Sequence, residues 1–151
     1  MRLKGFTLIE IIVVILIIAI LAAILIPTLA GYVSSSKLAT ANSNAKLAFE
    51  SAATYCTSCQ AEDKPVPGGT YNEICLKARQ IPDTYVTDGR HLEDALLSMI
   101  GSRSSASGYT SIRIDPKGLP NDARWAKKPT DRYVGSYPRS ASEAGSYDLS
   151  Y

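Results

Sequence analysis

The 151-residue chain is poor in the residues from which catalytic sites are usually built. It has one histidine and one tryptophan, and it contains no glycine-rich loop that could cradle a phosphate. No serine–histidine–aspartate set can be assembled from it. The acidic pairs at 62–63 and 93–94 are adjacent in sequence, which indicates solvated surface more than paired acid–base groups. The sequence therefore predicts a protein that is not an enzyme and has no cofactor.

Net charge is also nearly absent. Sixteen basic and 14 acidic residues give +2, and two of the basic residues, Arg2 and Lys4, lie in the first five positions. Bulk charge this small does not drive binding to nucleic acid. Between Glu10 and Lys37 there is no charge at all, and residues 11–26 are only Ile, Val, Leu and Ala. Since roughly 20 apolar residues span a bilayer, this segment predicts a transmembrane helix with Arg2 and Lys4 in the cytoplasm.

Two simpler interpretations of the apolar segment compete. A cleaved secretory signal usually has an apolar stretch of about 7–15 residues and ends at a small-residue site. This segment is longer, and the sequence after it has a helical pattern. A plain single-pass anchor fits the length but leaves Glu10 unexplained, because a carboxylate in a membrane span is costly and usually functional.

Residues 5–10, GFTLIE, resemble the processing motif of type IV pilins and pseudopilins. The resemblance covers residues 1 to about 55, and the short leader and first mature residue are like those of the IVa subclass. It implies that a prepilin peptidase cuts between Gly5 and Phe6 and methylates the amine of Phe6. It also implies that Glu10 is the assembly residue, which pairs with the Phe6 amine of a neighbouring subunit.

Electrostatics supports this interpretation of Glu10. A buried ion persists only when it is paired, and cleavage would give Phe6 a free amine. The amine of the same chain is a possible partner, because Phe6 and Glu10 are four residues apart on a helix. Between subunits, the pair would set the axial register, since a mispacked subunit would leave two uncompensated charges in hydrocarbon.

Two residues are expected to weaken the long helix within the span. Pro27 cannot donate to the carbonyl of Ala23, so it should kink or loosen the helix, and Gly31 weakens the next turn. One interpretation is a simple kink of a membrane helix. The other is a segment that melts or extends in the packed filament.

An alanine-rich stripe follows the span. Apolar residues recur every three or four positions at Leu38, Ala41, Ala45, Ala48, Ala52 and Tyr55. This is one face of a helix, and its small side chains let another layer approach closely. We predict an α+β fold, in which a long N-terminal helix packs on a small head with short helices and a small antiparallel sheet. The expected segments are a leader (1–5), the transmembrane half of the helix (6–36), its amphipathic half (37–55), the globular head (56–136) and a loosely ordered tail (137–151).

Within the head, Thr70 and Glu73 form a capping-box pattern, which predicts a helix over residues 71–80. A second helix is predicted over residues 90–100, ending at Gly101. Alternating β-branched residues predict a strand over 109–114, followed by a turn at 115–118. Further strands are expected around 123–127 and 133–134.

Three cysteines, Cys56, Cys59 and Cys75, lie in this exported head, where disulfides persist. An odd count indicates one bond and a free thiol, or an intermolecular link. A bridge from Cys56 or Cys59 to Cys75 would close the loop between them. A redox pair is disfavoured because C-x-x-C lies at a helix C-terminus, and a zinc site with His91 is the remaining alternative. Otherwise His91 is a surface helix residue.

A small basic cluster surrounds the only tryptophan, and consists of Arg124, Trp125, Lys127 and Lys128. An exposed tryptophan could stack on a DNA base or a sugar. We favour the alternative that Trp125 packs into the core of the head.

The resemblance implies a structural subunit held in membrane lipid as a single-pass protein of the inner (cytoplasmic) membrane. An assembly platform would then add it to a helical homo-oligomer, a cell-surface pilus for adhesion, motility or DNA uptake. One alternative is a pseudopilin of a type II secretion or competence machine. Another is a membrane-anchored binding domain that never polymerises.

Overall fold

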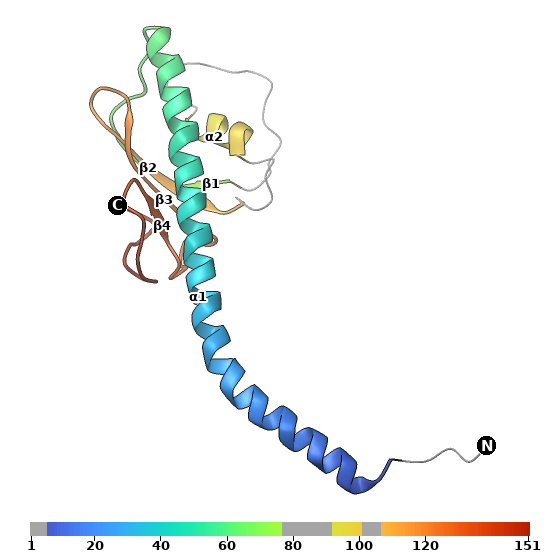
Figure 1. The fold of residues 1–151 in the computed structure, drawn as a ribbon. Coiled ribbons are helices and arrows are strands. Elements are labelled where there is room, and N and C mark those ends of the chain that lie inside the picture. The colour runs from blue at the N-terminus through green and yellow to red at the C-terminus, as the bar shows by residue number, and fades with distance from the viewer. Residues whose placement is uncertain (1–5, 77–91, 101–106) are drawn as a thin grey trace, which may run out of the picture. The chain divides into compact units, whose positions relative to one another are not determined.

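The computed structural model describes residues 6–76, 92–100 and 107–151 (Figure 1). Its elements are α1 (Leu8–Ala61), β1 (Gly69–Cys75), α2 (Leu92–Ile100), β2 (Tyr109–Ile114), β3 (Pro120–Ala126) and β4 (Gly135–Tyr137). The predicted α+β fold with a long N-terminal helix is confirmed. The chain forms two compact units, Met1–Ser35 and Ser36–Tyr151, and α1 contributes to both.

The first unit contains the apolar part of α1. Its large side chains are exposed, because no other described element covers them. The most apolar 18-residue window of α1 has a mean hydropathy of 3.5, and none of it is buried. By length and composition, α1 can cross a membrane.

The second unit is built on an antiparallel sheet in which the strands are ordered as they occur along the chain, β1-β2-β3-β4. A tight turn makes the β2–β3 connection, as predicted. The N–H of Gly118 donates to the carbonyl of Asp115 at 2.9 Å, and one carboxylate oxygen of Asp115 accepts from the N–H groups of Lys117 and Leu119. Gly118 has a φ of 81°, a left-handed conformation that glycine adopts without strain.

The alanine stripe of α1 forms one side of the core in this unit. Its members from Ala41 to Tyr55 are all buried, as predicted. The sheet contributes Ile112, Ile114 and Trp125 to the same cluster, and α2 contributes Leu92, Leu96 and Ile100. At Gly135 the backbones nearly touch, since a Cβ added there would lie 2.0 Å from the carbonyl carbon of Ala41. Small residues on both sides permit this close packing.

The side chain of Asn42 connects α1 to β4 and to the segment after it by hydrogen bonds. The amide of Asn42 donates to the carbonyl of Ala141 at 2.9 Å. Its oxygen accepts from the N–H groups of Ser136, at 3.1 Å, and Ala141, at 3.0 Å. Two backbone N–H groups and one carbonyl, from residues 94 and 99 positions away in the sequence, are satisfied by one asparagine.

The prediction of a helix over residues 71–80 is wrong for residues 71–75, which the structure describes as a strand. Residues 69–75 are strand β1, which pairs with β2 across a bulge between Tyr71 and Ile74. Glu73 has a φ of 54°, and its N–H donates to the Ser111 hydroxyl at 2.9 Å. Pairing with β2 buries Ile74, which outweighs the local capping pattern. Residues 77–80 of this prediction lie outside the described residues.

Other predicted bounds need smaller corrections. The second helix is confirmed as α2 over Leu92–Ile100, and residues 90, 91 and 101 lie outside the described residues. The strand predicted over 109–114 is β2. The next strand begins earlier, at Pro120, and the last is Gly135–Tyr137 instead of 133–134. The helix α1 continues to Ala61, beyond the expected end at residue 55, because Cys56 and Cys59 extend its buried face.

The tail at 137–151 was expected to be loosely ordered, but it packs on the outer face of the sheet. Leu149 is buried with Val134 and Ala126 in a second small cluster. The guanidinium of Arg124 donates to the carbonyls of Asp148 and Ser150 at 2.9 and 3.0 Å. The packing of the tail could not be predicted from a repeating sequence pattern, because isolated residues make these contacts instead of one face of a helix or strand.

Candidate functional site: the N-terminus of α1

The first described residues form a capping box at the start of α1. Thr7 precedes the helix, and its hydroxyl accepts from the N–H of Glu10 at 3.4 Å. In return, the N–H and the hydroxyl of Thr7 both donate to Glu10 Oε2, at 2.8 and 2.7 Å. This reciprocal arrangement satisfies backbone groups that a helix N-terminus leaves without partners. The pattern Thr-x-x-Glu is visible in the sequence here, but a capping box was predicted only at Thr70.

The two oxygens of the Glu10 carboxylate have different environments in the capping box. Both bonds from Thr7 go to Oε2, and Oε1 accepts no hydrogen bond from the described part of the chain. A carboxylate near a helix N-terminus is also favoured by the helix dipole. Glu10 is thus held by its own helix while one oxygen stays available to an outside donor.

Phe6 lies next to this box and is 85% exposed. Gly5, the other predicted cleavage residue, lies outside the described residues. Pro27 and Gly31 lie inside α1, which continues through both without interruption. The Thr28 hydroxyl donates to the carbonyl of Leu25 at 2.8 Å, and the Ser35 hydroxyl donates to that of Gly31 at 3.2 Å. A helix break at Pro27 and Gly31 in a filament stays a prediction.

The N-terminus matches one protein-family model. Residues 1–26 match the prokaryotic N-terminal methylation motif, which covers the proposed leader, the capping box and most of the apolar segment. This match supports a type IV pilin- or pseudopilin-like protein. No curated protein and no solved structure matches it. Proteins of this family are structural rather than catalytic, and the motif together with the apolar helix fits a membrane-anchored precursor.

The head of this pilin-like chain separates the residues of the predicted basic cluster. Trp125 is buried in the core with 4% of its surface exposed, so its ring cannot act as an open stacking platform. Arg124 points to the outer face, where it lies between the rings of Tyr147 and Tyr151, 5.2 and 4.0 Å from their centroids. Lys127 and Lys128 come directly after β3.

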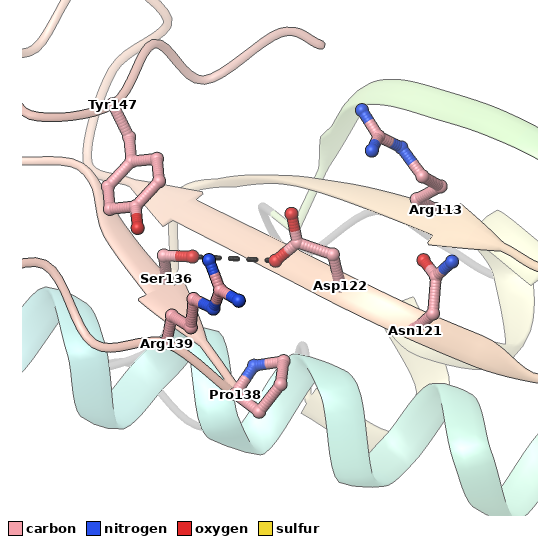
Figure 2. A pocket seen from close by; sticks show the side chains of 7 residues that line it. All are labelled: Arg113, Asn121, Asp122, Ser136, Pro138, Arg139 and Tyr147. Atoms are coloured by element: carbon pink, nitrogen blue, oxygen red, sulfur yellow. Dashed lines mark hydrogen bonds between the residues drawn. The ribbon is translucent and has the colours of Figure 1, made fainter.

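Figure 2 shows a pocket of about 310 Å³ on the outer face of the sheet. It is lined by Arg113, Asn121, Asp122, Ser136, Pro138, Arg139 and Tyr147. The Ser136 hydroxyl donates to Asp122 at 3.4 Å, and Arg139, from the segment after β4, lines the same pocket (Figure 2). Asp122 Oδ2 also lies 3.9 Å from Arg124 Nε. Within the described residues, Arg113 and Arg139 have no carboxylate in ion-pair range, which makes the pocket rich in donors.

A further pocket, of about 360 Å³, lies beside the first turns of α1 in the second unit, and we call it the Lys37 pocket. It is lined by Lys37, Thr40, Trp125, Lys127, Asp131 and Tyr133. The sequence indicates a basic cluster that includes Lys127, but no sequence pattern connects Lys127 with Lys37, which lies 90 positions earlier.

The three cysteines are free thiols in the structure. Cys56 and Cys59 are buried one helical turn apart, and burial together with the neighbouring Cys59 raises the pKa of Cys56 to about 12. Cys75 is exposed at the end of β1. The bridge to Cys75 stays a prediction. Among the described residues no group of three or more histidine, cysteine or acidic side chains could hold a metal, and His91 lies outside them.

Proposed function

We propose that the chain is the precursor of a structural subunit of a type IV pilus. A prepilin peptidase cuts after Gly5 and methylates the new amine of Phe6. The mature subunit waits in the inner membrane as a single-pass protein, and the assembly platform then packs its apolar helix into a surface filament. The observation that carries this proposal is the methylation motif over residues 1–26, followed by a helix with no buried side chains in its apolar window.

The capping box gives Glu10 a defined role in that filament. Thr7 holds Oε2, so Oε1 is presented in a fixed direction for the Phe6 ammonium of a neighbouring subunit. Pairing compensates both charges where water is excluded, and a subunit in the wrong register would leave both charges unpaired. Glu10 is the assembly residue in this proposal, and Thr7 is its positioning residue.

The first experiment tests processing. The full chain is expressed with a prepilin peptidase, and the mature N-terminus is determined by mass spectrometry. The expected product begins at N-methylated Phe6. A product that keeps residues 1–5, or is cut elsewhere, would contradict the proposal.

The second experiment tests assembly with Glu10→Ala and, as a matched control, Glu50→Ala. Glu50 is an exposed carboxylate on the same helix, and its Lys46 partner is 3.7 Å away at the surface. Glu10→Ala should be processed and inserted normally but should yield no sheared filaments, while Glu50→Ala should assemble like the parent. Filament yields equal to the parent in Glu10→Ala would refute the pairing.

The positioning role of Thr7 needs its own comparison. Thr7→Ser keeps a hydroxyl for the box, whereas Thr7→Val keeps the shape and removes it. We expect Thr7→Ser to assemble normally, and Thr7→Val to be processed but to assemble several-fold less, because losing an N-cap costs about 1 kcal/mol. Equal filament yields from the two variants would contradict this role.

A pseudopilin of a secretion or competence machine is the second candidate, and it shares the motif and the helix. Long filaments in the sheared surface fraction would favour the pilus. Processed subunit without such filaments would favour the pseudopilin. An anchored binding domain that never polymerises is less favoured, because it gives Glu10 no partner.

Contact of the filament with DNA or a glycan would need a surface other than a stacking Trp125, since that ring is buried.

A further inference from the structure

The Lys37 pocket carries more positive than negative charge. Lys37 and Lys127 contribute two ammonium groups, and Asp131 contributes one carboxylate. One oxygen of that carboxylate accepts the N–H of Tyr133 at 3.1 Å, which completes a local turn. Two ammonium groups and one carboxylate leave the pocket with one positive charge in excess.

Both ammonium groups keep unused donors. Lys127 donates to the carbonyl of Ser107 at 3.2 Å, and an ammonium has three N–H donors, so two of them remain. Lys37 lies 5.3 Å from the centroid of the Tyr133 ring, and it has no ion pair within the described residues. A ring below the ammonium fixes its position but leaves its outward donors for an anion.

The place of Lys37 in the sequence indicates where such an anion would come from. Lys37 is the first charged residue after the uncharged span, and Thr40 follows one turn later on the same helix. When the span is in a bilayer, Lys37 is therefore close in sequence to the membrane surface on the exported side. Lysine, tyrosine and tryptophan are the side chains that gather at this level of a membrane.

We propose that the Lys37 pocket binds the headgroup of an anionic phospholipid while the subunit is stored in the membrane. Lys37 and Lys127 donate to the phosphate oxygens, and the ring of Tyr133 forms the wall beside the glycerol. The proposal rests on the membrane-stored form described under the proposed function. Lipid binding does not require filament formation. A negative result in the processing or assembly experiments would therefore not be a negative result for lipid binding.

The test uses the full chain in an uncharged detergent, with lipid binding measured by native mass spectrometry. Phosphatidylglycerol is titrated as the anionic probe, and phosphatidylcholine as the neutral comparison. The variants are Lys37→Gln, Lys127→Gln and the double substitution. Lys46→Gln is the matched control, because Lys46 is an exposed lysine of the same helix outside the pocket. Fluorescence of the buried Trp125 checks that each variant is folded.

We expect the parent to prefer phosphatidylglycerol to phosphatidylcholine. Each pocket substitution should weaken phosphatidylglycerol binding about five-fold, since one basic residue near an anionic headgroup contributes about 1 kcal/mol. The double substitution should remove the preference, and Lys46→Gln should keep it. Two results would overturn the proposal. One is an unchanged preference in the folded double variant. The other is free glycerol 3-phosphate displacing the lipid at equal concentration, which would indicate a site for soluble phosphates.

Discussion

Replacing Asn42 by alanine should destabilise the head strongly, although the substitution removes only one small polar side chain. Three hydrogen bonds of 2.9–3.1 Å are lost together. A typical hydrogen bond contributes about 0.5–1.5 kcal/mol net, and a backbone group left unsatisfied in a partly buried site adds to the cost. The gain in helix propensity from alanine is below about 0.7 kcal/mol. We therefore expect Asn42→Ala to lower the free energy of unfolding by about 2–4 kcal/mol.

The assay is urea unfolding of the full chain in micelles, followed by fluorescence of Trp125, the only tryptophan. With a slope of about 2 kcal/mol per molar urea, the middle of the usual range for small proteins, the midpoint should fall by about 1–2 M. Thr54→Ala is the control, because the Thr54 hydroxyl is exposed and bonds only within its own helix, to the carbonyl of Glu50. Its effect should stay within about 0.5 kcal/mol. If Asn42→Ala were as mild as Thr54→Ala, the connection we assign to Asn42 would be refuted.

Two further predictions concern packing and thiol chemistry. Gly135→Ala should prevent native packing of β4 on α1, because the added Cβ would lie 2.0 Å from the Ala41 carbonyl carbon. At Gly145 an added Cβ would meet no atom, but φ is 86°, so Gly145→Ala should lower the free energy of unfolding by only about 1 kcal/mol through backbone strain. Equal melting temperatures of the two variants would contradict this steric explanation. For the thiols, alkylation of the folded chain followed by mass spectrometry should label exposed Cys75 rapidly, and it should label the buried Cys56 only after unfolding, because its pKa of about 12 keeps it protonated at neutral pH. A chain in which Cys75 resists labelling until a reductant is added would show instead that Cys75 is in a disulfide.

The pattern Thr-x-x-Glu occurs twice in this chain, and the two outcomes show what local sequence can predict. At Thr7 it caps α1, because an uninterrupted apolar helix follows it. At Thr70 the same pattern falls in β1, since β2 offers a partner strand and Ile74 becomes buried. The motif describes how a helix can begin, and the rest of the fold decides whether one does.

Elements with a strong period could be predicted, and features made by single distant residues could not. The alanine stripe and strand β2 follow from periods of 3.6 and 2 residues. The packing of Leu149, the three bonds of Asn42 and the meeting of Lys37 with Lys127 depend on long-range placement. The capping box could have been predicted, because Thr7 and Glu10 lie within one helical turn. The two head pockets described above could not, because each draws on separate elements.

The close packing of α1 on β4 also has a mechanical consequence. Between Ala41 and Gly135 the two elements touch through their backbones, and Asn42 forms one hydrogen bond to Ser136 of β4 and two to Ala141 after it. Long side chains can change rotamer and yield under load, but backbone contacts cannot. A force applied along α1 would therefore be transmitted to β4 with little relative displacement of the two elements. In the filament proposed above, this end of the head would therefore move together with the helix under tension.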